Sequence, residues 1–150
     1  MTPPRLNAMQ LDEIRALHAG VSRSLGDWWK DDRRNWCAYC GIPMRKRAGK
    51  GTPLPPNKAT RDHVIPKAHK GGLVTVPACL ACNAAKGTMS LPEFLSSAHF
   101  MQRRALKHRN KWPIPDLWAL SGLAALKRAE VALAANAPPR PRRATAGHTR

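Results

Sequence analysis

Residues 77–87 read Pro-Ala-Cys-Leu-Ala-Cys-Asn-Ala-Ala-Lys-Gly, and this stretch decides the fold. The two-residue spacing between Cys79 and Cys82 lets both thiols bind one metal ion. Gly87 fits the end of a helix, because glycine accepts the backbone conformation that helix C-termini often require. We therefore predict that a helix begins at Cys79 and that two metal-binding thiols lie at its start.

A second Cys-x-x-Cys pair lies upstream, at Cys37 and Cys40. Two such pairs supply the ligands of a tetrahedral zinc site, and four thiolates leave no coordination position open. Free or disulfide-bonded cysteines are the alternative. The N-terminus shows no apolar signal segment, which favours a reducing, cytoplasmic location and metal ligation. We therefore predict a structural zinc ion bound by Cys37, Cys40, Cys79 and Cys82.

Two short strands are predicted between the cysteine pairs, at 60–66 and 73–78. The first ends in Asp62-His63-Val64-Ile65-Pro66, and Lys70-Gly71-Gly72 supplies turn residues before the second. With the helix that begins at Cys79, the local order is strand, strand, helix.

Helices are predicted on both sides of this unit. An apolar periodicity in residues 1–24 indicates a short helix that Gly20 could end. Ser90-Leu91-Pro92-Glu93 has the pattern of a capping box, so a helix should run on to about Arg109. A last helix is expected from about 116 to 135.

The predicted class is α+β, with a small zinc-stabilised finger flanked by helices. The predicted regions are an N-terminal helical extension (1–24), the zinc-stabilised module (25–90), C-terminal helices (91–135) and a disordered basic tail (136–150).

The charge of the chain is strongly positive. It has 26 Lys and Arg against 9 Asp and Glu, a net charge of +17. Such a chain attracts polyanions, mainly through the phosphate backbone, so DNA is the expected partner, although charge alone does not separate DNA from RNA. No apolar run is long enough to span a membrane, and no membrane partner is expected.

Three tryptophans lie in residues 25–36, just before the first cysteine pair. We expect their rings to cover the metal-binding loop as part of a core. Stacking on nucleic-acid bases is the alternative.

The ordered pattern Asp62-His63, Lys70-Gly71-Gly72, Cys79-x-x-Cys82-Asn83-x-x-Lys86-Gly87 resembles the HNH endonucleases, specifically the subgroup with a four-cysteine zinc site. The resemblance covers about residues 35–90. It implies a ββα-metal fold, cleavage of DNA by hydrolysis of phosphodiester bonds through nicking or double-strand cutting, and a bacterial or phage-infected cell as the setting.

The resemblance also implies roles for individual residues. His63 would activate water as the general base, Asp62 and Asn83 would hold a catalytic Mg²⁺, Mn²⁺ or other divalent ion, and Lys86 would lie near the scissile phosphate. A neutral histidine accepts a proton near neutral pH, and carboxylate and amide oxygens suit these hard ions. The basic residues expected to contact DNA phosphates are Lys86, Lys67, Lys70, Arg61, Arg103 and Arg104.

One position departs from the family pattern. Family members usually carry an asparagine ahead of the second cysteine pair, where this chain has Val74-Thr75. The departure favours an alternative function, a non-catalytic zinc-stabilised DNA-binding module. In that case Asp62 could pair with Arg61 or cap a turn, and Asn83 could form hydrogen bonds at the helix start.

Overall fold

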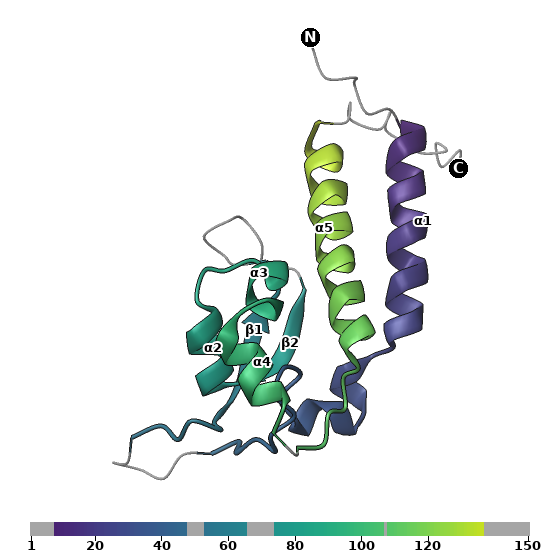
Figure 1. The fold of residues 1–150 in the computed structure, drawn as a ribbon. Coiled ribbons are helices and arrows are strands. Elements are labelled where there is room, and N and C mark those ends of the chain that lie inside the picture. The colour runs from purple at the N-terminus through teal and green to yellow at the C-terminus, as the bar shows by residue number, and fades with distance from the viewer. Residues whose placement is uncertain (1–7, 48–52, 66–73, 107, 137–150) are drawn as a thin grey trace, which may run out of the picture.

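The computed structural model describes residues 8–47, 53–65, 74–106 and 108–136 (Figure 1). Its class is α+β, as predicted, with a two-stranded antiparallel sheet and several helices. None of the helices in these ranges combines the length and the apolarity needed to cross a lipid bilayer.

The sheet pairs β1 (Ala59–His63) with β2 (Thr75–Cys79), and His63 lies opposite Thr75. The chain then passes directly into α2 (Leu80–Lys86), which gives the predicted order of strand, strand and helix. Both strands are shorter than predicted. Residues 66–73, which include the predicted Lys70-Gly71-Gly72 turn, lie outside the described residues.

Cys79 explains the abrupt passage from strand to helix. It is the last residue of β2 and the N-cap of α2, and its Sγ accepts a hydrogen bond from the Cys82 backbone N–H at 3.4 Å. This bond satisfies one of the N–H groups that a helix leaves unpaired in its first turn. Gly87 ends the helix at a φ of +51°, a region that favours glycine, so this predicted helix end is confirmed.

The long helix predicted from the capping box is two short helices in the structure, so this prediction was wrong. They are α3 (Leu91–Leu95) and α4 (Ala98–Arg104). Ser97 separates them, because its Oγ donates to the Phe94 carbonyl at 2.6 Å and accepts from the Phe100 N–H at 3.2 Å. Serine side chains can replace helical backbone bonds in this way, which ends one helix and begins the next.

Two long helices lie side by side and antiparallel, α1 (Ala8–Leu25) and α5 (Ile114–Asn136) (Figure 1). An ion pair between Arg15 and Glu130 joins them at 3.5 Å. The prediction that Gly20 ends the first helix was wrong. The helix continues to Leu25, and Gly26, with a φ of +70°, follows it.

Two 3₁₀ turns, η1 (Trp28–Lys30) and η2 (Asp32–Asn35), carry the chain from α1 to the first cysteine pair. Arg33 fixes this segment, since its guanidinium binds the Asp31 carboxylate and donates to the Leu25 carbonyl at 2.8 Å.

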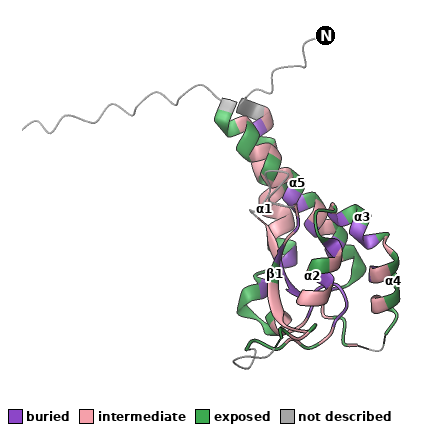
Figure 2. Cartoon of the chain, turned by 90° about the vertical axis from the view of Figure 1, so that its left-hand side faces the viewer, coloured by how far each residue is buried: buried purple, intermediate pink, exposed green. Residues whose placement is uncertain are grey.

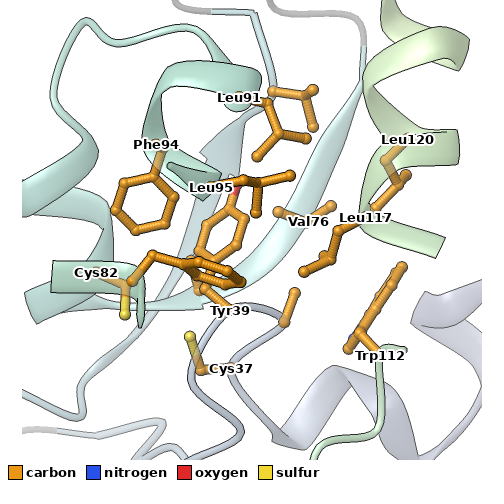
Figure 3. Packing of buried hydrophobic residues seen from close by; sticks show 14 of the residues in the cluster. Cys37, Tyr39, Val76, Cys82, Leu91, Phe94, Leu95, Trp112, Leu117 and Leu120 are labelled. Carbon is orange, nitrogen blue, oxygen red and sulfur yellow. The ribbon is translucent and has the colours of Figure 1, made fainter. Parts of the chain in front are cut away.

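Nearly all of the buried apolar side chains form one cluster that joins the sheet, the cysteines and the helices. Buried residues gather around the sheet, whereas most residues at the far ends of α1 and α5 are partly or fully exposed (Figure 2). Leu11 of α1 is a buried exception. Tyr39 and Phe94 meet edge to face at 4.9 Å between ring centroids. Leu117 and Leu120 bring α5 onto the same core as Val76 of β2 (Figure 3). The predicted boundary at 24–25 lies one residue before the end of α1, and that at 90–91 lies at the start of α3, but the division into regions itself stays a prediction.

The break between α3 and α4 generates a testable prediction. Replacing Ser97 by alanine removes the α4 cap and the bond to Phe94, so the free energy of unfolding should fall by about 0.5–2 kcal/mol. The measurement is urea denaturation followed by circular dichroism. The control is Ser121→Ala, a position inside α5, where alanine is a good helix former. An equal loss in both variants would contradict the capping role.

Candidate functional site

The four cysteines converge on one point. Their Sγ atoms all lie within 4.8 Å of one another, and all four residues are buried. The Sγ atoms of Cys40 and Cys79 are 3.8 Å apart. Two sulfurs bound to one zinc ion at tetrahedral angles are about 3.8 Å apart, whereas a disulfide bond is about 2.05 Å long. The cluster therefore fits a metal ion such as zinc, and it does not contain a disulfide.

The first cysteine pair lies on a tight turn that is bonded to β2. The Gly41 N–H donates to the Cys37 carbonyl at 2.9 Å, and the Ala38 N–H donates to the Pro77 carbonyl at 2.8 Å. Gly41 has a φ of +75°, and a Cβ there would come within 2.5 Å of Asn110 Oδ1. Glycine is therefore required for both the turn and its packing.

The four thiols cannot all ionise freely in so small a space. Hydrogen bonding to the Cys37 thiol, together with burial, raises the pKa of Cys82, whereas hydrogen bonding to the same thiol lowers the pKa of Cys79. A divalent cation removes this competition, because it takes the place of the protons and stabilises every thiolate.

Two basic side chains of α4, His99 and Arg103, lie beside the sulfurs. His99 was not among the predicted site residues. His99 Nε2 is 3.5 Å from Cys82 Sγ. Burial and the charge of Arg103 lower the pKa of His99, which favours the neutral imidazole as a donor to the thiolate. Burial acts to lower the pKa of Arg103 itself, but the charge of the cysteine thiolates, Cys40 first, outweighs it and raises that pKa. The signal available in the sequence was the four-residue spacing of His99 and Arg103 on one helix.

Asp62, the predicted metal ligand, points into the protein. Its carboxylate is buried, with the residue 4% exposed. Oδ2 accepts a hydrogen bond from the Tyr39 hydroxyl at 2.5 Å and pairs with Lys86 Nζ at 3.2 Å. Burial and the negative charge of Asp62 raise the pKa of Tyr39, so the phenol stays protonated and donates. Asp62 pairs with Lys86 rather than with Arg61, which the sequence suggested as an alternative partner.

Lys86 is enclosed as completely as Asp62. Its side chain has no exposed surface, and its ammonium also donates to the His63 carbonyl at 3.0 Å. Lys86 thus ties α2 to the end of β1. Its expected contact with the scissile phosphate stays a prediction, and that contact requires the pair with Asp62 to open.

The predicted catalytic residues lie on both faces of the sheet. Side chains alternate along a strand, so Asp62 and its neighbour His63 point to opposite faces. Asn83 of α2 donates from Nδ2 to Thr60 Oγ1 at 2.9 Å, and Thr60 lies on the same face of β1 as Asp62. The structure therefore brings Asp62 and Asn83 to the α2 side and directs His63 to the other side.

The remaining predicted DNA-binding residues are in three different settings. Arg61 is exposed, with its guanidinium 5.8 Å from the Trp28 ring centroid. The Arg104 guanidinium is bound within the protein, where it donates hydrogen bonds to the carbonyls of Ala38, Tyr39 and Trp112. Lys67 and Lys70 lie outside the described residues.

Comparison of the chain with protein-family models, with curated proteins and with solved structures gives no match.

The cysteine cluster generates the next prediction. The purified protein should contain one zinc ion per chain by atomic absorption, and Cys40→Ser should lose it, because three thiolates bind the ion less tightly than four. Zinc binding to such sites supplies about 10–16 kcal/mol toward folding, so a strong chelator should unfold the module. As a control, His99→Ala should keep the ion with about 10- to 100-fold weaker affinity, the usual effect of losing a partner of a ligand. A Cys40→Ser protein with a full zinc content would contradict the site.

The buried ion pair generates a second prediction. Lys86→Met leaves the Asp62 carboxylate buried beside an apolar side chain, which should lower the free energy of unfolding by about 3–5 kcal/mol. Adding Asp62→Asn removes the uncompensated charge and should restore most of that loss. The measurement is chemical denaturation of both variants. A double variant no more stable than Lys86→Met alone would show that the pair is not the cause.

Proposed function

We propose that this protein is a metal-dependent endonuclease of the HNH type that hydrolyses phosphodiester bonds of DNA. The observation that carries the proposal is the unit of β1, β2 and α2, which is built against the four cysteines and holds Asp62, His63 and Asn83 on elements in contact. The residue types are those that the reaction needs, in the order typical of the ββα-metal finger.

His63 is proposed as the general base. It lies at the end of β1 and is partly exposed, so an imidazole nitrogen can reach a water molecule from solvent. A neutral imidazole accepts the proton of that water as the water attacks phosphorus. Lys86 binds the His63 carbonyl at 3.0 Å and so holds the backbone that carries the base.

Asp62 and Asn83 are proposed to hold a divalent ion such as Mg²⁺ or Mn²⁺. Their oxygens suit such an ion by type, and the two residues belong to the same side of the sheet. When bound, the ion would supply positive charge that neutralises the phosphate and the leaving oxygen. Because Asp62 and His63 point to opposite faces of β1, the ion and the base can act on one phosphate only at the end of β1, and only if the strand twists there. The Lys86 ammonium now lies 3.2 Å from Asp62 Oδ2, so ligation by Asp62 requires Lys86 to give up this contact.

DNA is the proposed partner because of charge. The chain carries +17 overall, and the described exposed residues include Arg34, Arg45, Lys46 and Arg61. Contacts to phosphates position a protein on DNA without reading its sequence, so weak sequence preference is expected.

A second candidate function is a non-catalytic zinc-stabilised DNA-binding module. The closed Asp62–Lys86 pair favours it, because the carboxylate is already neutralised within the protein. Val74-Thr75, in place of the usual asparagine, favours it as well. This module would bind DNA in a salt-sensitive way and release it uncut.

The deciding experiment is incubation of the zinc-loaded protein with supercoiled plasmid in the presence of Mg²⁺, Mn²⁺ or no added divalent ion. Open-circular or linear DNA should form only with the ion. His63→Ala should lower the rate by about 100-fold or more, because it removes the general base. His108→Ala, which lies outside the finger, should cut like the wild type. Retarded but uncut plasmid under every condition would favour the non-catalytic module instead.

A further inference from the structure

The outer face of the sheet carries a basic groove with an exposed indole, which we call the Trp29 groove. It has a volume of about 380 Å³. This falls within the range of small-ligand sites, about 300–1,000 Å³. Its walls include Trp29, Arg34, Lys46, Lys58 and Arg61.

The charge of the groove is positive. None of the lining residues, all within the described ranges, is acidic. Lys58 donates to the Lys46 carbonyl at 2.7 Å and Arg34 to the Trp29 carbonyl at 3.5 Å, so these two cations are held by neutral oxygens. In the described part of the chain the nearby carboxylates of Asp27, Asp31 and Asp32 form ion pairs with basic residues that do not line the groove, and Asp31 also interacts with the charge of Arg34.

Trp29 is held in place although half of it is exposed. The exposed fraction of Trp29 is 52%, whereas that of Trp28 is 8%. The two rings meet edge to face at 5.8 Å between centroids and an angle of 86°. Trp28 thus belongs to the core, as predicted, and contacts the exposed indole of its neighbour. For Trp29 the prediction of a core position was wrong, because half of its surface is exposed. A rigid aromatic face beside phosphate-binding cations is the arrangement that binds unpaired nucleotides.

The groove continues past the same residues into a second hollow. Trp28, Trp29 and Arg61 also line a space of about 440 Å³ between the sheet and the long helices. Thr75, which lies opposite His63 in the sheet, lines this second space. Arg61 and His63 are two residues apart on one face of β1 and therefore roughly 7 Å apart. A strand held at Arg61 consequently passes close to the proposed base.

We propose that the Trp29 groove binds single-stranded DNA, with one unpaired base stacked on Trp29 and the flanking phosphates held by Arg34, Lys46, Lys58 and Arg61. Duplex DNA does not satisfy this site, because both faces of a paired base are covered by its neighbours in the stack. The inference rests on the proposed function for the choice of DNA, and it adds that the substrate has an unpaired segment next to the cleavage position.

The test measures binding separately from cutting. The protein is zinc-loaded His63→Ala without added Mg²⁺, and the probes are a labelled thymidine 15-mer and a duplex of equal length, followed by fluorescence anisotropy. Trp29→Ala should weaken binding of the single strand about 5- to 150-fold, the range for one stacked base, and change duplex binding less than twofold. Trp29→Phe should recover most of the affinity, since a second aromatic ring can stack.

The matched control is Trp118→Ala. Trp118 is 48% exposed on α5 and is not among the residues that line either hollow. Three outcomes would each overturn the proposal. Trp29→Ala could leave the single-strand affinity unchanged, or Trp118→Ala could lower it equally. The protein could also bind a uridine 15-mer more tightly than the thymidine probe. If the protein cuts plasmid but Trp29 does not contribute to single-strand binding, only the proposal for the groove is refuted. If Trp29 contributes to single-strand binding but the wild-type protein cuts plasmid under no condition, only the proposed nuclease activity is refuted.

Discussion

The mutual approach of four cysteine sulfurs is the constraint on which the rest of this structure depends. Cys79 ends β2, caps α2 and contributes a thiol, so one residue fixes where the sheet stops and where the helix begins. The turn that carries Cys37 is bonded to β2 through Ala38 and Pro77. A small core gains much from one metal ion, because the ion joins segments that are far apart in the sequence. His99 and Arg103 then join α4 to the same centre.

Local signals predicted most of the unit of two strands and a helix, and non-local contacts explain what they missed. The paired cysteines, Gly87 and the turn residues Lys70-Gly71-Gly72 predicted strand, strand and helix, because each signal acts over a few residues. The capping box at Ser90 also predicted the start of α3 correctly, but periodicity could not show that Ser97 would cap a new helix. One long helix and two short helices were both compatible with the sequence. Serine stabilises a helix start and interrupts a helix interior by the same hydrogen bonds.

The candidate site was predictable in composition but not in geometry. The order of Asp62, His63 and Asn83 could be read from the chain, and so could the divergence of adjacent side chains on a strand. The partner of Asp62 could not. Lys86 lies 24 positions later, and nothing in a single sequence marks a lysine that will be buried, because isolated lysines are nearly always exposed. The pair forms because α2 covers the inner face of β1, where each charge requires the other.

The two faces of the sheet therefore place charge in opposite environments. On the inner face a carboxylate, an ammonium and a phenol satisfy one another away from water, and any ligand role of Asp62 begins with release of Lys86. On the outer face the cations around Trp29 remain open to solvent and available to a polyanion. A negatively charged DNA strand bound there makes the electrostatic potential across the thin sheet more negative. A more negative potential attracts cations toward the inner face. The proposed strand binding on one face and the proposed ion binding on the other are thus expected to be coupled through β1, the strand that carries Asp62, His63 and Arg61 together.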